Sequence, residues 1–258
     1  MAPKTFLPFE LMTDRTVLGS FFLAGVVFIA FYCWDAYLNP YLLVVHGLSI
    51  TQAAYVSSIY TVGSSFWALV VGFAISVTGR FKWIALYFGA PVYTLGVGLM
   101  IYFRGYGFGI GYIVMCQIFT AFAGGTLVIC WQIAAMAASK HENIATILAV
   151  ENMFANIGGA IGSTISAAIW TSTFPAALQR FLPQEDLSKL NKIYLDIPTQ
   201  LSYPLGSPTR NAIALAYDEG QKWMLTAGVV VSVFTIFCVA VWRDIKVKDF
   251  KQTKGTVV

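Results

Sequence analysis

The sequence predicts an all-α membrane protein with six transmembrane helices and a structured external loop. Charged residues make up 11% of the 258 residues, against about 25% in an average soluble domain. Hydrophobic residues make up 58%, more than a soluble core of this length buries, so the long apolar runs are expected to face lipid.

Six apolar runs are long enough to cross about 30 Å of hydrocarbon at ~1.5 Å per residue. We expect spans near residues 16–38, 51–77, 83–103, 110–138, 145–173 and 223–242. Trp223 and Trp242 bracket the last span, about 28 Å apart along a helix at ~1.5 Å per residue, as interfacial aromatic residues do. The first run is interrupted at Asn39-Pro40, because proline removes a helix hydrogen bond.

The positions of lysine and arginine predict the orientation. With six spans both termini lie on one side, which carries these cations: Lys4, Arg15, Arg80, Lys82, Lys140, Arg243, Lys246, Lys248, Lys251 and Lys254. The opposite short loops carry only Arg104. The positive-inside rule therefore places both termini in the cytosol. The chain then divides into a cytosolic linker (1–15), a five-span bundle (16–173), an extracytoplasmic loop (174–222), a final helix (223–242) and a cytosolic tail (243–258).

Turn and helix signals predict that the external loop is a folded cap. In the tetrapeptide 203–206, proline and glycine occupy positions that a type I turn favours. Ser207 suits an N-cap, Pro208 the first helical position and Gly220 the residue after a helix end, which predicts a helix over 208–219 that leads into the last span. A further helix is expected near 183–193.

The turn after the second span carries a glycine and cation motif, within "GFAISVTGRFKW". Four residues match the spacing of the cytosolic gating-loop signature of the major facilitator superfamily: Gly72, Gly79, Arg80 and Lys82. In that signature glycines permit a tight turn, and the cations engage acidic groups or helix C-termini. Ser76 occupies the signature's acidic position, which weakens any gate built on a salt bridge there. The alternative interpretation is a simple positive-inside turn.

The fifth span contains one acid and two amides. Glu151 lies about 10 Å from the predicted cytosolic end at ~1.5 Å per residue, where an ionisable group is costly unless it faces a cavity or a partner. It is a candidate for proton coupling, or an interfacial acid if the span begins later. Asn152 and Asn156 extend the polar face, and Asn156 is a candidate substrate contact. The glycines of this span, including Gly158, predict close helix packing.

The end of the first span groups polar residues beside a proline: Asp35, Tyr37, Asn39 and Tyr41. Broken helices of this kind expose ligands for a substrate in transporters. The alternative is an interfacial aromatic belt with a solvated Asp35.

No pattern of catalytic, cofactor-binding or metal-binding residues occurs. The sequence lacks H-E-x-x-H, G-x-S-x-G and P-loop motifs, and "GYGFGIG" follows no predicted strand. His46 and His141 have no second ligand at metal spacing, and the four cysteines lie in apolar runs. The net charge of +4 follows from loop asymmetry. We therefore expect no enzyme, cofactor, metal site or nucleic-acid partner.

Three stretches resemble the fungal siderophore iron transporters, fourteen-span members of the major facilitator superfamily. They are "KTFLPFELMTDRT", "WDAYLNPYLLVVHGLSITQAAYV" and "LSYPLGSPTRNAIALAYDEGQKWM", and the similarity covers nearly the whole chain. The resemblance implies proton-driven import of a ferric siderophore that the last external loop handles. The implied substrate contacts, suited to a compact and nearly neutral ferric hydroxamate, are Tyr203, Tyr217, Tyr37, Asn39 and Tyr41. The implied proton carriers are Glu151 and Asp35.

Such transporters pair two helical bundles, and this chain corresponds to the C-terminal bundle with the final spans. An N-terminal half, on the same or a separate chain, is therefore an expected partner, in a plasma or endosomal membrane. Two alternatives stay open: a drug or organic-ion exporter of the same superfamily, and a non-transporting siderophore-binding or regulatory membrane protein.

Overall fold

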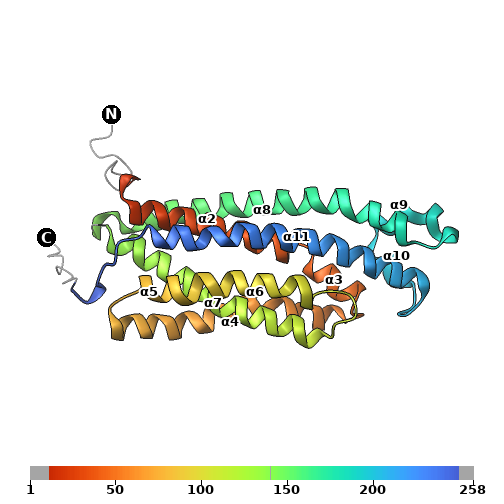
Figure 1. The fold of residues 1–258 in the computed structure, drawn as a ribbon, viewed down its shortest axis with the longest axis horizontal. Coiled ribbons are helices and arrows are strands. Elements are labelled where there is room, and N and C mark those ends of the chain that lie inside the picture. Colours follow the sequence, from red (N-terminus) through yellow and green to blue (C-terminus); the bar gives the residue numbers. More distant parts are fainter. Residues whose placement is uncertain (1–11, 140, 250–258) are drawn as a thin grey trace.

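A computed structural model describes residues 12–139 and 141–249, which form an elongated bundle of helices (Figure 1). Six helical segments are long and apolar enough to cross a membrane: Arg15–Val44, Ile50–Thr78, Lys82–Phe103, Ile110–Ala137, Ile144–Phe181 and Pro208–Ala240. The prediction of an all-α protein with six spans is confirmed. The predicted linker and tail lie largely outside the described residues, as do Lys4, Lys140, Lys251 and Lys254.

The first span is broken, as predicted, but at a different place. Helix α2 (Arg15–Asp35) is separated from α3 (Leu38–Val44) at Ala36 and Tyr37. The prediction of a break at Asn39-Pro40 is wrong, because Pro40 lies in the first turn of α3. The N–H groups of a first turn have no partner within the helix, so a proline is tolerated there.

The second span, α4 (Ile50–Thr78), has well-defined ends. It begins with a capping box in which Ser49 and Gln52 exchange hydrogen bonds (3.2 and 3.1 Å). It ends at Gly79, whose φ of +72° is left-handed and suits a glycine.

The third and fourth spans follow as α5 to α7. The third consists of α5 (Lys82–Ile84), a π-helical turn (Ala85–Gly89) and α6 (Ala90–Phe103). The π-helical turn directly precedes Pro91, which occupies the first turn of α6. The fourth span is α7 (Ile110–Ala137).

The last two long helices extend further than predicted. Helix α8 (Ile144–Phe181) continues past residue 173, and α11 (Pro208–Ala240) is one helix where a short helix and a separate span were expected. Gly220 lies inside α11 and not after a helix end. A Cβ at this position would lie 3.2 Å from the Trp170 ring of α8, so glycine permits this helix contact.

Between these two helices lies the cap segment, residues 182–207, at one end of the bundle (Figure 1). It contains a 3-10 helix (Gln184–Lys189), α9 (Leu190–Leu195) and α10 (Ile197–Ser202). The prediction of a helix near 183–193 is confirmed in substance. The described ends of the chain lie at the opposite end of the bundle, here called the terminal end (Figure 1).

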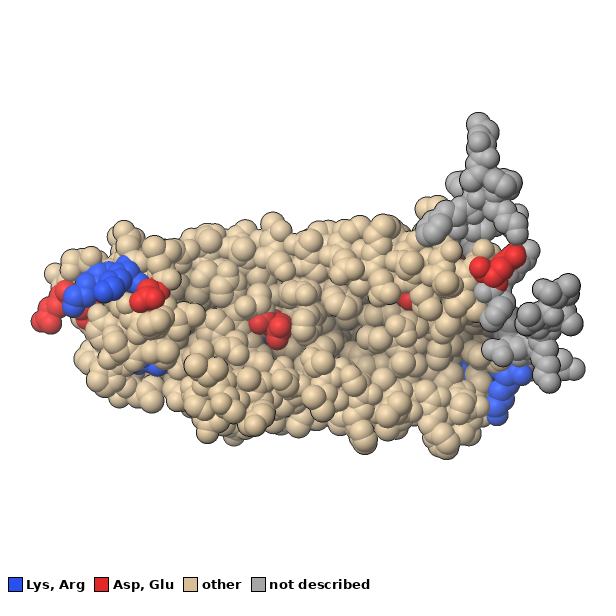
Figure 2. Space-filling model, turned by 180° about the vertical axis from the view of Figure 1, so that it is seen from behind, with Lys and Arg blue, Asp and Glu red and all other residues tan. Residues whose placement is uncertain are grey.

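Helices α2, α8 and α11 pack together, and α4, α6 and α7 pack beside them (Figure 1). Gly158 and Gly162 of α8 face the backbone of α2, where a Cβ on Gly158 would collide with the carbonyl oxygen of Gly25. The predicted close packing at these glycines is confirmed. Most charged side chains gather at the two ends of the bundle, as a membrane requires, and a few acidic atoms are visible between the ends (Figure 2).

Candidate substrate pathway and cap

The break in the first span is held by the last helix. The ring of Tyr37 stacks on Trp170 of α8, with centroids 4.3 Å apart and an interplanar angle of 14°. The carbonyl oxygen of Tyr37 accepts a hydrogen bond from Gln221 Nε2 of α11 (3.0 Å). The same carbonyl oxygen accepts from the Tyr41 N–H of α3 (3.2 Å), so the backbone at the break is hydrogen-bonded within the protein, as membrane-spanning structure requires. Asn39 is exposed on the first turn of α3.

Tyr41 is buried and binds a loop that sequence reasoning did not single out as a site. Its hydroxyl donates to the carbonyl oxygen of Arg104 (2.6 Å), in the connection between α6 and α7. The Arg104 guanidinium lies 5.4 Å from the Tyr41 ring and donates from Nη1 to the carbonyl oxygen of Trp34 (2.7 Å). Arg104 therefore joins the end of α2 to α3. Asp35 is half-buried and lies within electrostatic reach of Arg104.

A second buried arginine, Arg210, fastens the cap segment to α3. Only 3% of Arg210 is exposed. Its Nε donates to the carbonyl oxygen of Val44 at the end of α3 (2.8 Å), and Nη1 donates to the carbonyl oxygen of Gln200. Weaker contacts reach the carbonyl oxygens of Tyr203 and Leu43 (both 3.4 Å). A guanidinium suits this role because it presents five donors in one plane.

Tyr217 lies inside the junction between the cap segment and the bundle. Its hydroxyl donates to Gln200 Oε1 (2.9 Å), and Gln200 Nε2 donates to the carbonyl oxygen of Ile193 (2.7 Å). Its ring packs 5.0 Å from that of Trp170 and 4.8 Å from that of Phe174. With 1% of its surface exposed, Tyr217 holds the cap together in this conformation. It does not face open space.

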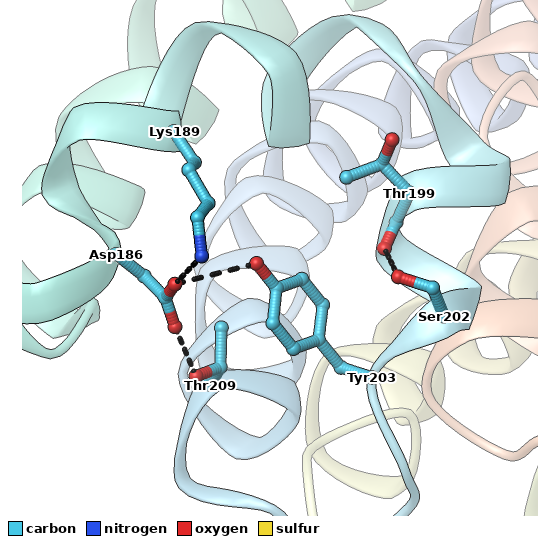
Figure 3. A network of polar contacts seen from close by, with 6 residues as sticks. All are labelled: Asp186, Lys189, Thr199, Ser202, Tyr203 and Thr209. Carbon is cyan, nitrogen blue, oxygen red and sulfur yellow. Dashed lines mark hydrogen bonds and ion pairs between the residues drawn. The ribbon is translucent and has the colours of Figure 1, made fainter.

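Tyr203 contributes to a polar network within the cap (Figure 3). Asp186 accepts hydrogen bonds from Lys189 Nζ (2.8 Å), Thr209 Oγ1 (2.7 Å) and the Tyr203 hydroxyl (3.4 Å). The hydrogen bonds from Lys189 and Thr209 are the main causes that hold the pKa of Asp186 below its ordinary value of 3.8. Tyr203 is half-buried, so it is closer to the outer surface than Tyr217.

The two span acids do not share a site. Glu151 is 3% exposed, and its Oε1 has no hydrogen-bond partner among the described residues. Asp35 lies one turn after Tyr32, whose carbonyl oxygen accepts a hydrogen bond from Ser166 of α8 (2.9 Å). Ser166 therefore marks the level of Asp35 along α8. Glu151 lies about 22 Å from Ser166 along α8 at ~1.5 Å per residue. Asn156 is exposed, and so it points away from the buried side of Glu151.

The cation motif binds the chain segment that follows α11. Lys82 Nζ donates to the carbonyl oxygens of Ala240 (2.9 Å) and Trp242 (2.5 Å), which caps the C-terminus of α11. Arg80 pairs with Asp244 (3.8 Å), and the Gly79 carbonyl oxygen accepts from the Val247 N–H (2.8 Å). The chain segment after α11 thus contacts Gly79, Arg80 and Lys82, the three motif residues that follow α4.

Gly72 and Ser76 have no comparable role. A Cβ at Gly72 would meet nothing within 4 Å. Ser76 Oγ donates to its own helix at the Phe73 carbonyl oxygen (2.7 Å). The acid that pairs with Arg80 comes from position 244 and not from position 76.

Among residues 12–139 and 141–249, no cluster of three histidine, cysteine or acidic side chains could hold a metal ion. Burial, followed by the Arg104 charge, lowers the pKa of His46, which favours the neutral imidazole.

No protein-family model matches the chain. It is 55% identical over 257 residues to MFS siderochrome iron transporter 1 of Ajellomyces capsulatus, covering 100% of this chain and 44% of that protein. It is 49% identical to MFS siderochrome iron transporter D of Aspergillus fumigatus (100% and 43%). It is 42% identical to siderophore iron transporter mirB of Emericella nidulans (99% and 42%). The chain therefore spans less than half the length of these relatives.

Among solved structures, a bacterial homologue of the human lysosomal transporter Spinster, inward-facing and unoccupied, matches with a TM-score of 0.64. The match covers 94% of this chain and 52% of that one at 15% identity, which shows the fold alone. The fold agrees with the alignments to the fungal transporters, which cover nearly the whole of this chain. This chain belongs to the fungal siderophore iron transporter family of the major facilitator superfamily.

Proposed function

We propose that this chain is the C-terminal helical part of a proton-coupled importer of ferric siderophores. The observation that carries this proposal is the 55% identity, over the whole chain, to a siderochrome iron transporter. The cap segment fastened to a broken helix supports it, because such an arrangement can link ligand capture outside the membrane to movement of a span.

Four side chains that are exposed or half-buried are the proposed substrate contacts: Tyr37, Asn39, Tyr203 and Asn156. A ferric hydroxamate is compact and nearly neutral, so ring faces and uncharged polar groups suit it. We assign Tyr41 and Tyr217 to holding α3 and the cap in place, because both are buried and their hydroxyls are used within the protein.

Asp35 and Glu151 are the proposed proton carriers. Both are acids within spans, and Glu151 is buried. An ionised carboxylate in such a position is costly unless it meets a cavity or a cation. Protonation is therefore expected to accompany burial, and deprotonation to accompany opening toward water.

A second helical half is the proposed partner. Helices α4 and α8 are little buried within this chain, and α8 exposes the amides of Asn152 and Asn156. Exposed apolar side chains occur on all three helices, such as Phe66 of α4, Ile157 of α8 and Phe234 of α11, but the spanning part of α11 exposes no amide. Lipid tails cannot satisfy an amide, so we assign the α4 and α8 faces to the partner half and the α11 face to lipid. The proposed orientation places both termini in the cytosol, in a plasma or endosomal membrane.

The test is uptake of iron-55 from a ferric hydroxamate in cells that lack their own siderophore importers. The chain is expressed alone and with the N-terminal half of a related siderochrome iron transporter, and its amount in the membrane is measured. We expect uptake only when both halves are present. Binding of the ferric hydroxamate without uptake, at equal membrane levels, would instead favour a binding or regulatory protein.

A further inference from the structure

A groove of about 510 Å³ lies between α8 and α11, and none of the proposed substrate contacts lines it. Ile169 and Thr173 of α8 line one side, and Trp223, Thr226, Ala227 and Val230 of α11 line the other. From Trp223 to Val230 the groove is about 10 Å long at ~1.5 Å per residue. This is less than half of a hydrocarbon core of about 30 Å, so the groove belongs to the leaflet next to the cap.

The walls of the groove are apolar although two threonines line it. Thr173 Oγ1 donates to the carbonyl oxygen of Ile169 (2.6 Å), and Thr226 Oγ1 donates to that of Lys222 (2.8 Å). Both hydroxyls are thus used by their own helices, and the wall surface is almost entirely carbon. A ligand that fits this wall makes no hydrogen bonds there, which describes an alkyl chain.

The end of the groove nearest the cap is charged. Lys222 lies one turn before Thr226 and two turns before Val230, so these three residues share one face of α11. Lys222 is exposed and forms no direct ion pair with an acid of the described residues, and it lies within electrostatic reach of Asp218, one turn earlier on α11. The ion pair between Arg180 and Glu219 (2.5 Å) crosses from α8 to α11 at the same end. This end therefore offers an exposed lysine, free of a direct ion pair with the described residues, beside an apolar groove.

We propose that this groove binds a phospholipid, with one acyl chain between α8 and α11 and the phosphate at Lys222. Trp223 lies at the level of the lipid headgroup, where its amphipathic ring is favoured. A sterol would fill the apolar groove but would make little use of the cation, so a phospholipid fits both features. This binding does not depend on transport of a siderophore.

The test uses the chain in phosphatidylcholine vesicles that contain a small fraction of phosphatidylglycerol with a photoreactive acyl chain. Labelling is expected in the peptides that carry residues 169–173 and 223–230. Ala227→Phe fills the groove and should lower this labelling several-fold. Leu69→Phe, on the exposed face of α4 and away from α8 and α11, should leave it unchanged.

Lys222→Gln tests the headgroup and is expected to fold normally, because the side chain is exposed. It should lower the preference for phosphatidylglycerol over phosphatidylcholine about fivefold, which corresponds to about 1 kcal/mol for one cation at a membrane surface. Lys192→Gln, an exposed lysine of the cap segment, should have no effect. Labelling that Lys222→Gln leaves unchanged, that a sterol displaces, or that disappears when the N-terminal half is added would overturn the proposal.

Discussion

The Tyr217 hydroxyl contributes one buried hydrogen bond to the junction between the cap segment and the bundle. It donates to Gln200 Oε1 within the buried junction (2.9 Å). Tyr217→Phe leaves that oxygen buried without a partner, which should destabilise the folded cap by about 1–3 kcal/mol. Tyr106→Phe is the matched control, because its hydroxyl donates to Asn211 at an exposed position (3.1 Å) and its loss should cost under about 0.5 kcal/mol. Proteolysis of the cap in vesicles measures the difference, and equal rates for both variants would contradict the buried role.

Glu151 tests the proposed proton coupling. Glu151→Gln removes the titratable group while keeping its size, so uptake by the two-half transporter should lose much of its pH dependence. Glu185→Gln, at an exposed site in the cap segment, is the control and should keep the pH profile of the unaltered protein. Iron-55 uptake between pH 5 and pH 8 distinguishes the two, and an unchanged profile for Glu151→Gln would argue against a role in coupling.

The lowered pKa of Asp186 predicts how the stability of the cap changes with pH. Its hydrogen bonds favour the carboxylate, so its pKa in the folded cap lies below the ordinary value of 3.8. A group with a depressed folded pKa contributes stability above its unfolded pKa and loses it as the pH falls through the folded pKa. The cap should therefore keep this contribution at the pH of an acidified vesicle and lose it only below pH 3.8. Proteolysis of the cap at each pH measures this loss of stability. In Asp186→Asn the acid-dependent loss should be absent.

At the scale of single elements, the length of the apolar runs predicted the spans well. Proline and glycine, the residues that often end helices, predicted the ends of the helices less well. Pro40 and Gly220 were both expected to end helices. Pro40 instead starts α3, and Gly220 lies inside α11 against Trp170. For Gly220, packing against Trp170 of α8 decides the outcome, and a sequence window does not contain that neighbour. For Pro40, the break at Ala36 and Tyr37 places the proline in a first turn, where it is tolerated.

Replacing Gly79 or Gly72 of the cation motif with alanine should change the stability of the protein in opposite directions. Gly79 has a φ of +72°, and its added Cβ would lie 3.0 Å from Lys248 Cγ. Gly79→Ala should therefore destabilise the protein by about 1–2 kcal/mol. Gly72 lies within α4 with open space around it, so Gly72→Ala should stabilise it by about 0.5–1 kcal/mol. Thermal unfolding in detergent measures both. A matching loss of stability in the two variants would contradict the structural role given to Gly79.

At the scale of the whole molecule, the residues that sequence reasoning missed are those with distant backbone partners. Arg104 binds the carbonyl oxygen of Trp34, and Arg210 binds that of Val44. Neither pairing follows from local pattern, because the carbonyl groups belong to helices far away in the chain. One signal was available: Arg210 shares a helix face with Ile213 and Tyr217, at spacings of three and seven. A charged residue on an apolar face indicates a buried partner.

The exposed faces of the whole bundle lead to the last prediction, which concerns the partner half. Asn156 of α8 and Phe234 of α11 are both exposed in this chain, but only the amide requires water or protein beside it. In a background with Cys238, the one half-buried cysteine, replaced by serine, each position is changed to cysteine. A hydrophilic maleimide should label Asn156→Cys in vesicles, since the reaction needs a thiolate in water.

Adding the N-terminal half should lower labelling of Asn156→Cys several-fold, because the proposed partner covers the α8 face and leaves only the proposed substrate pathway open beside residue 156. Phe234→Cys should stay unlabelled in both states, because lipid covers the α11 face. Folding of each variant is checked by its thermal unfolding, and the amount of the added half is measured in the same membranes. Labelling of Asn156→Cys that the other half leaves unchanged would remove α8 from the partner interface. Labelling of Phe234→Cys would mean that the faces of the bundle are assigned to lipid and partner the wrong way round.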